Sequence, residues 1–270
     1  MRASAAARMP RFAANLSFLF TEWPFLDRFA AAADAGFEAV EYLFPYEWPA
    51  EVLAERLQRN GLTQALFNVS SGDWAAGDRG LAALPARESE RRAAVRLATE
   101  YAEALGCRRV HLMAGVGSRD DANAVAAYRE SVRESASTLA ERGIDLLIEP
   151  INRRDVPGYF LDDFGFARRL IEALALPNLK LQFDIYHRQI LHGDVATALR
   201  ELMPIVGHVQ IASVPGRHEP DTEELNFAHL LAELDRLGYQ GWVGCEYRPR
   251  AGTLEGLAWF RPHASRARRD

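Results

Sequence analysis

The sequence predicts an α/β fold in which eight parallel strands close into a single-domain (β/α)8 barrel of the TIM type. Three observations support this prediction. Short β-rich segments alternate with longer amphipathic ones along the whole chain, glycine recurs where the amphipathic segments end, and the chain has 270 residues. Barrels of this type typically have about 250 residues and fold as one unit. No low-complexity linker divides the alternation.

The predicted strands are short runs rich in aliphatic and β-branched residues. Because longer helical segments separate them, each crossover returns the chain to the same edge of the sheet, so the strands are predicted to be parallel. Eight such units can close into a barrel with its helices in one outer layer. The predicted strands are Phe12–Ser17, Ala39–Leu43, Gln64–Val69, Arg109–Met113, Asp145–Glu149, Lys180–Asp184, Gly207–Ile211 and Trp242–Glu246.

The segments between the strands show the apolar periodicity of amphipathic helices. They are Phe25–Ala35, Ala50–Asn60, Glu88–Leu105, Asn123–Arg142, Phe164–Ala173, Val195–Leu202 and Ala228–Leu237. Glycine follows a helix at positions 36, 61, 106, 143 and 238, as expected where the residue past the last turn takes a positive φ. A doubly wound open sheet is the rival fold, but no Gly-x-Gly-x-x-Gly motif follows the first strand.

The barrel is predicted to span residues 11–262, between a flexible N-terminal tail at residues 1–10 and a basic C-terminal tail at residues 263–270. The first eight residues lack the long hydrophobic region of a secretory signal, and no apolar run approaches the ~18 residues that span a bilayer. Cys107 and Cys245 stand alone and are expected to be small buried hydrophobes. These features predict a cytoplasmic protein without a membrane partner.

Composition narrows the class of partner. Hydrophobic residues make up 49% of the chain and charged residues 26%, which is typical of a well-packed globular domain. The formal net charge of −5 gives no electrostatic reason for binding nucleic acid. The sequence therefore predicts a small molecule as the partner.

Polar residues close the last four predicted strands, which are otherwise apolar: Glu149, Asp184, Gln210 and Glu246. Because parallel strands all point the same way, these ends meet on one face of the barrel, where active sites are built. Three carboxylates would repel one another there unless a divalent cation is bound. Ligation by oxygen alone favours Mg²⁺ or Mn²⁺ over Zn²⁺, with other divalent ions left open. Taken singly, each residue could instead cap a helix or face solvent.

The loops after these strands carry a second set of candidates. His187, three residues past Asp184, either donates a hydrogen bond to a substrate or anchors its loop. Arg217 offers a planar fork suited to a carboxylate, and a surface ion pair is the alternative. Asp155 either contacts a substrate hydroxyl or forms a turn. His218 is expected to help Arg217.

Earlier strands contribute polar residues that are predicted to line the pocket, namely Glu41, Asn68 and His111. Aromatic side chains near the strand ends either form a dry pocket wall or pack in the core. These are Phe18, Phe20, Trp23, Tyr42, Phe44 and Trp74.

Several longer blocks carry a resemblance to a known family. Among them are Asn15-Leu-Ser-Phe-Leu-Phe-Thr-Glu22, Glu149-Pro-Ile-Asn152, Asp184-Ile-Tyr-His187, Val214-Pro-Gly-Arg-His-Glu-Pro220 and Gly241-Trp-Val-Gly-Cys-Glu-Tyr-Arg-Pro249. From about Asn15 to Phe260 the chain resembles the hydroxypyruvate isomerase family, within the xylose isomerase-like barrel superfamily. The closely similar 2-oxo-tetronate isomerases share most of these blocks.

The resemblance implies an isomerase that interconverts hydroxypyruvate and tartronate semialdehyde through an enediolate, in carbohydrate and glyoxylate metabolism. It implies that the metal ligands are Glu149, Asp184, Gln210 and Glu246, and that the two glutamates are also the acid/base pair. His187 and Arg217 would then contact the substrate, a small hydroxy-carbonyl acid, and Asp155 would bind a substrate hydroxyl. Family members commonly form homo-oligomers, so self-association is left open.

The chain departs from the family pattern at two places beside the pocket. Ser213 stands where the pattern reads Asp, and Val69-Ser70-Ser71 replaces Leu-Pro-Ala. Losing a carboxylate beside Arg217 could change how that arginine is oriented. The alternatives are a 2-oxo-tetronate isomerase, a ketose 3-epimerase, which needs the same metal and two bases, and a binding barrel without turnover. A DNA endonuclease of the same superfamily is disfavoured by the negative charge and by only seven histidines.

Overall fold

The computed structural model describes residues 10–221 and 223–263, and it contains a closed barrel of eight parallel strands in the order β1 to β8. The strands are β1 Arg11–Asn15, β2 Ala39–Tyr42, β3 Thr63–Asn68, β4 Arg109–His111, β5 Asp145–Ile148, β6 Leu179–Asp184, β7 Val206–Ile211 and β8 Trp242–Cys245. Each matches a predicted strand to within two residues at either end. The barrel prediction is confirmed and the open sheet is excluded. The expected tails lie, apart from residues 10 and 263, outside the described residues.

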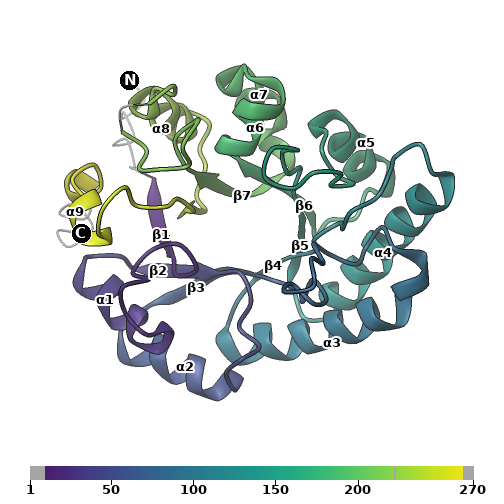
Figure 1. Cartoon of the computed structure of the whole chain (residues 1–270), viewed down its shortest axis with the longest axis horizontal. Coiled ribbons are helices and arrows are strands. Elements are labelled where there is room, and N and C mark those ends of the chain that lie inside the picture. Colours follow the sequence, from purple (N-terminus) through teal and green to yellow (C-terminus); the bar gives the residue numbers. More distant parts are fainter. Residues whose placement is uncertain (1–9, 222, 264–270) are drawn as a thin grey trace, which may run out of the picture.

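The helices form an outer layer around the strands (Figure 1). They are α1 Arg28–Asp34, α2 Ala50–Arg59, α3 Glu88–Leu105, α4 Ala122–Ala140, α5 Phe164–Leu174, α6 Ile185–His192, α7 Val195–Leu202, α8 Phe227–Arg236 and α9 Thr253–Gly256, with 3-10 turns η1 Phe25–Asp27, η2 Pro85–Arg87 and η3 Met203–Ile205. All seven predicted helical segments are confirmed. The five glycines expected after helices have φ between 62° and 98°. None of the helices in the described part of the chain is both long enough and apolar enough to cross a membrane.

The prediction that His187 lies in a loop is wrong, because it belongs to the first turn of α6. The cause is Asp184, which ends β6 and also caps α6. Its side chain accepts hydrogen bonds from the backbone N–H groups of Tyr186 and His187. A side-chain oxygen at this position satisfies N–H groups that have no partner within the helix. The strand therefore passes into the helix without an intervening loop.

The apolar core lies between the strands and the helices, where one cluster joins strand residues such as Val110 and Phe183 to helix residues such as Leu53 and Leu199. Cys107 and Cys245 are free and buried, as predicted. The barrel interior is different. A small second cluster there contains Ala13, Ala39, Ala65 and Trp242. The three alanines of this cluster leave room inside the barrel for polar groups.

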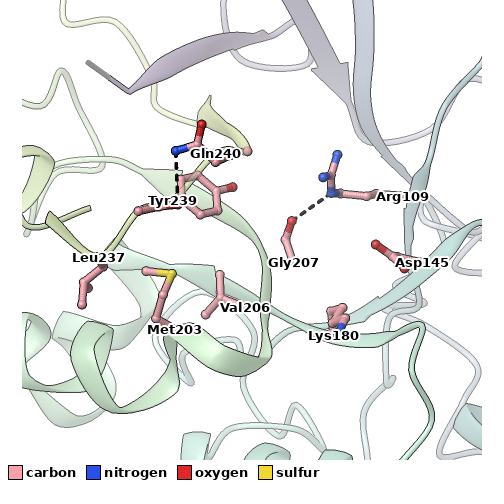
Figure 2. Close-up of a pocket in the computed structure, with 11 residues that line it drawn as sticks. Arg109, Asp145, Lys180, Met203, Val206, Gly207, Leu237, Tyr239 and Gln240 are labelled. Carbon is pink, nitrogen blue, oxygen red and sulfur yellow. Dashed lines mark hydrogen bonds between the residues drawn. The ribbon is translucent and has the colours of Figure 1, made fainter. Parts of the chain in front are cut away.

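A cavity of about 400 Å³ lies at the amino-terminal end of the barrel (Figure 2). Arg109, Asp145 and Lys180, from the beginnings of β4, β5 and β6, line it. Arg109 Nε donates a hydrogen bond to the carbonyl oxygen of Gly207 at 2.8 Å. Because β4 and β7 are not neighbours in the barrel, this bond crosses the interior. Polar groups at this end of such barrels are usually associated with stability, whereas chemistry takes place at the opposite end.

Candidate active site

Every strand contributes a polar residue at or just beyond its carboxyl end. These residues are Asn15, Glu41, Asn68, His111, Glu149, Asp184, Gln210 and Glu246, and each is at most 7% exposed. A pocket of about 390 Å³ opens at this end of the barrel, and Glu149, His187, Arg217 and Glu246 are among the residues that line it. The predicted pocket-lining role of Asn68 and His111 is confirmed, whereas Glu41 lies deeper.

Glu149, Asp184 and His187 form a buried cluster. One possible ligand atom from each of the three lies within 4.8 Å of the others. Oδ1 of Asp184 caps α6, while its Oδ2 is buried and has no hydrogen-bond partner among the described residues. A buried carboxylate oxygen without a partner is costly unless a cation or donor is supplied. Asp184 therefore combines the capping role and a free oxygen that faces the cluster.

The electrostatics of the pocket are dominated by three buried carboxyl groups. Burial raises the pKa of Glu149 well above its usual range, and the charges of Asp184 and Glu246 raise it further. Burial also raises the pKa of Asp184 to about 6, against the lowering effect of Arg217. Glu246 has a pKa raised to about 8, again chiefly by burial. Strongly perturbed carboxyl groups in a cleft are typical of a functional site.

Arg217 is the cation nearest these carboxylates. Its Nη2 lies 2.6 Å from Glu246 Oε1 and 3.7 Å from Asp184 Oδ2, and its Nη1 lies 3.3 Å from Asp155 Oδ2. The guanidinium also packs over the Tyr186 ring, 4.8 Å from its centroid. Its side chain is only 12% exposed, so Arg217 does not form the surface ion pair that was the alternative.

The backbone of Arg217 adopts the left-handed region, with φ of 57°. For a residue with a side chain this conformation costs about 1 kcal/mol or more, and it persists only where the surroundings hold it. Two backbone bonds do so: Arg217 N–H donates to Ser213 O at 3.0 Å, and its carbonyl accepts from Arg248 N–H at 2.8 Å. The chain thus holds the guanidinium over the carboxylates at some conformational cost.

The protonation of His187 can be deduced from its partners. Its Nδ1 lies 3.2 Å from the backbone nitrogen of Asn152, whose N–H can only donate. Nδ1 must therefore be an acceptor, and in the neutral ring the proton lies on Nε2. Burial and the charge of Arg217 lower the pKa of His187 well below its usual range, which keeps the ring neutral. Nε2 lies 3.7 Å from Asp184 and 3.9 Å from Glu149, so it presents a donor to the pocket.

Gln210 lies within a network of buried amide groups. Its Nε2 donates to Glu41 Oε1 at 2.8 Å and also to Glu246 Oε2, while its Oε1 accepts from Gln182 Nε2 at 2.6 Å. Asn15 Nδ2 bridges the same two glutamates, at 3.1 Å from Glu41 and 3.2 Å from Glu246. Sequence reasoning missed Asn15 and Gln182. Strand alternation was the usable signal for Gln182, because it lies two residues before Asp184 and so faces the same side.

Two candidates lie differently from what their sequence positions suggested. His218 is not among the residues that line the pocket; its Nδ1 bonds to the carbonyl oxygen of Arg248 at 2.8 Å. Ser213 Oγ lies 2.6 Å from Glu223 Oε2 and accepts from the backbone N–H of His218 at 3.1 Å. A carboxylate is thus present in this loop after all, supplied by Glu223. Asp155 lines the pocket, and its Oδ1 accepts from the Tyr186 hydroxyl at 3.1 Å.

The rim of the pocket carries two further arginines that were not predicted, Arg79 and Arg248. Arg79 stacks on Trp74, with 4.0 Å between the guanidinium carbon and the ring centroid. Of the aromatic residues considered from the sequence, Phe18 and Trp74 line the pocket, while Phe20 and Tyr42 belong to the buried core. Positive charge at the mouth favours an anionic ligand.

Comparison with known proteins gives consistent results. The model of the xylose isomerase-like TIM barrel family matches residues 29–263. The chain is 54% identical over 260 residues to 2-oxo-tetronate isomerase from Cupriavidus necator, covering 96% of this chain and 100% of the relative. It is 42% identical over 257 residues to hydroxypyruvate isomerase from Escherichia coli, covering 94% and 100%. A solved structure from Brucella melitensis, described as an AP endonuclease of family 2, is 50% identical with a TM-score of 0.93, covering 94% and 99%.

Proposed function

The chain belongs to the xylose isomerase-like TIM barrel family, and from that premise we propose that it is a metal-dependent isomerase of a small hydroxy-carbonyl acid. The observation that carries the proposal is the convergence of Glu149, Asp184 and Glu246, all buried, beside a single arginine. Such an arrangement is unfavourable for a structural purpose alone. It suits a site that binds a cation and moves protons.

The donor set fits a divalent ion with oxygen ligands. Glu149, Asp184, Gln210 and Glu246 would hold it, as their places at the strand ends suggested. Asp184 Oδ2 has no hydrogen-bond partner among the described residues, and Gln210 Oε1 keeps a second lone pair beside its bond from Gln182. Mg²⁺ and Mn²⁺ match carboxylate and amide oxygens. The proton on His187 Nε2 makes that residue a substrate donor rather than a ligand.

The proposed reaction moves a carbonyl group between C2 and C3 of a 2-oxo acid that carries a hydroxyl on C3. One glutamate of the Glu149 and Glu246 pair takes the C3 proton, and the released electron pair forms the C2–C3 double bond of an enediolate. A proton is then returned to C2, and the proton of the C3 hydroxyl moves to the C2 oxygen. The carbonyl group now lies at C3, and the isomerisation involves no net redox change. The metal, when bound, would stabilise negative charge on the two oxygens.

The substrates proposed first are 2-oxo-tetronate and hydroxypyruvate, which share this C2–C3 unit. The motifs alone placed hydroxypyruvate first, whereas the 54% identity to a 2-oxo-tetronate isomerase exceeds the 42% to a hydroxypyruvate isomerase and favours the four-carbon acid. Arginines around the pocket favour an acid over a neutral ketose, the substrate of a 3-epimerase. A pocket of only about 390 Å³ and a net charge of −5 do not suit a DNA duplex.

An NMR assay tests the proposal directly. The purified protein with Mn²⁺ or Mg²⁺ is incubated in D₂O with each acid and with a set of free ketoses. We expect conversion of at least one acid to its 3-oxo isomer, with deuterium entering C2, and no epimerisation of ketoses. If neither acid reacts nor exchanges its C3 proton, the proposed reaction is wrong. If ligand binds without any exchange, the chain is a binding barrel.

Replacing Arg217 by alanine is expected to lower kcat/KM for the acid substrate by roughly 10- to 100-fold, since charge-assisted hydrogen bonds contribute about 1.5–3 kcal/mol. The guanidinium lies beside both Asp155 and Glu246 and can reach a substrate carboxylate between them. Steady-state kinetics of Arg217→Ala measure the loss. Arg200→Ala, on α7 and paired with Glu233, is the control with the same substitution outside the pocket. An unchanged kcat/KM would remove Arg217 from substrate binding.

The raised pKa values predict how pH acts on the metal-free protein. Asp184 has a pKa of about 6 and Glu246 one of about 8, both above the ordinary value near 4, so folding favours the protonated carboxyls. Their contribution to stability is full in acid and is lost as pH rises through 6 and then 8. Thermal unfolding with a chelator should show a falling Tm across this range. With excess Mn²⁺ the fall should disappear, because metal binding favours the ionised forms.

A further inference from the structure

Glu41 occupies the interior of the barrel beneath the proposed metal site. It is 1% exposed, and it accepts hydrogen bonds through Oε1 from Asn15 Nδ2 at 3.1 Å and Gln210 Nε2 at 2.8 Å. Its Oε2 lies 2.7 Å from His208 Nε2. Glu41 is on β2, whereas Gln210 and His208 are on β7, on another side of the barrel (Figure 1). The carboxylate therefore joins strands that share no backbone bonds.

Strand β8, which is separated from β2 by β1 alone, leaves space for this carboxylate. A Cβ atom placed on Gly244 of β8 would lie 2.3 Å from Glu41 Oε1 and 2.4 Å from its Oε2, far closer than atoms can approach. Gly244 does not adopt a positive φ, so its backbone conformation does not require glycine. The close approach of the Glu41 carboxylate explains why a residue without a side chain lies there. Glu41 thus has a built position, although it does not line the pocket.

The chemistry of Glu41 determines the orientation of its neighbours. An ionised carboxylate can only accept, so any amide group that faces it must present nitrogen. Gln210 therefore turns Nε2 toward Glu41 and, in the same direction, toward Glu246. Its oxygen then points the other way, toward Gln182.

The same reasoning extends one residue further. Because Gln210 Oε1 is an acceptor, Gln182 must turn its Nε2 toward it, and the two atoms are 2.6 Å apart. This leaves Gln182 Oε1, which is buried and has no partner among the described residues, while Gln182 lines the pocket. A buried oxygen without a hydrogen bond is unfavourable unless a ligand donates to it or a cation binds it.

We propose that Glu41 is a positioning residue that fixes the amides of Gln210 and Gln182 with their oxygens, rather than their NH₂ groups, available to the cation and substrate. The inference rests on the proposed function for the metal. With both amides turned the other way, Gln182 would present its NH₂ group to the pocket in place of its unpaired oxygen. Glu41 thus acts on metal affinity through Gln210, without touching the metal or the substrate.

The variant Glu41→Gln tests the proposal with almost no change in size. Its side chain can turn either an oxygen or an NH₂ group toward Gln210, so the amide chain is no longer held in one orientation. We expect the Kd of Mn²⁺ for the metal-free protein to rise by about tenfold or more, measured by the EPR signal of free Mn²⁺. The matched control is Glu233→Gln on α8, which neutralises a carboxylate that is 2% exposed and bonded to Arg200. It should leave this Kd unchanged.

A second substitution that restores Mn²⁺ binding distinguishes an effect of amide orientation from an effect of lost charge or packing at Glu41. In E41Q/Q210E, a carboxylate replaces the Gln210 amide and offers oxygen at both ends, so its orientation no longer matters. We expect the double variant to bind Mn²⁺ within about threefold of the wild type, a gain larger than Q210E gives alone, as a double-mutant cycle measures. Wild-type affinity in E41Q, or a double variant with no gain beyond that of Q210E alone, would overturn the proposal.

A neutron structure of the deuterated wild-type protein shows the orientation of the Gln210 amide directly. It requires no variant, so it applies even if E41Q does not fold. Deuterium on Gln210 Nε2 facing Glu41 is the expected result, and an ND₂ group facing Gln182 would overturn the proposal. This measurement also separates the two hypotheses. If the wild type binds no Mn²⁺, the proposed metal is wrong, while the amide orientation set by Glu41 is still decided by the neutron density.

Discussion

Replacing Glu149 or Glu246 by glutamine is expected to lower kcat by at least about 10³-fold. A general base or acid typically contributes 10²- to 10⁴-fold, and each glutamate is also a proposed metal ligand. Glutamine keeps the size of the side chain but cannot take up a proton. Burial and neighbouring charge raise the pKa of both groups, so each can hold a proton at a pH where an exposed carboxyl cannot.

Steady-state rates and deuterium exchange together assign the two roles. A variant that lacks the group acting at C2 but keeps the group acting at C3 should still exchange the C3 proton with solvent while forming no product. Mn²⁺ binding is measured on the same variants, so that loss of metal is distinguished from loss of the base. Glu219→Gln is the matched control, because this carboxylate is 3% exposed and bonds to Arg250 N–H rather than to the pocket. Near-wild-type turnover in either Glu149→Gln or Glu246→Gln would contradict the acid/base assignment.

The strand ends could be found from sequence because polar residues there break an apolar pattern. Glu149 follows three buried residues of β5, and Glu246 follows four buried residues of β8. Parallel strands then bring such residues to one face without any knowledge of loops. The same logic failed for α6, where Asp184 serves as strand end and helix cap at once. No turn residue marks the boundary, so nothing in the sequence separated a loop from a helix.

The barrel interior was harder to predict than its rim. Alternation places Gln182 and His208 on the inner side of their strands, but it does not say which groups they meet. Glu41 and His208 are 167 residues apart in the chain, and Gln182 and Gln210 are 28 apart. Such pairings depend on the register of the closed barrel and on the space left by Gly244. A polar residue in a strand can therefore be identified, while its partner cannot.

The loop around Ser213 shows a related limit. The departure from the family pattern predicted a missing carboxylate beside Arg217, yet Glu223, ten residues later, bonds to the Ser213 hydroxyl and to Gly216 N–H. An irregular loop has no periodicity from which this contact between Glu223 and Ser213 could be deduced. What holds Arg217 in its left-handed conformation is likewise backbone contact with Ser213 and Arg248, which no side-chain pattern encodes.

Removing the metal is expected to abolish isomerisation, and adding Mg²⁺ or Mn²⁺ back is expected to restore it. Three buried carboxyls share one arginine at the place where the enediolate must develop negative charge, so without a divalent cation that developing charge has no adequate counterpart. Activity is measured after dialysis against a chelator, with residual metal determined by elemental analysis, and again after each ion is returned. Circular dichroism of the dialysed protein controls for unfolding.

The outcome of dialysis bears on the whole site rather than on one residue. Full activity in a sample shown to contain no metal would leave Glu149, Asp184 and Glu246 without the cation that explains their burial together. The raised pKa values would then mean that neutral carboxyl groups perform the chemistry, and activity should fall as pH rises through about 8, where Glu246 ionises. A metal-dependent site predicts the opposite slope, because protons compete with the cation for the same oxygens. The pH profile before and after dialysis therefore distinguishes the two mechanisms.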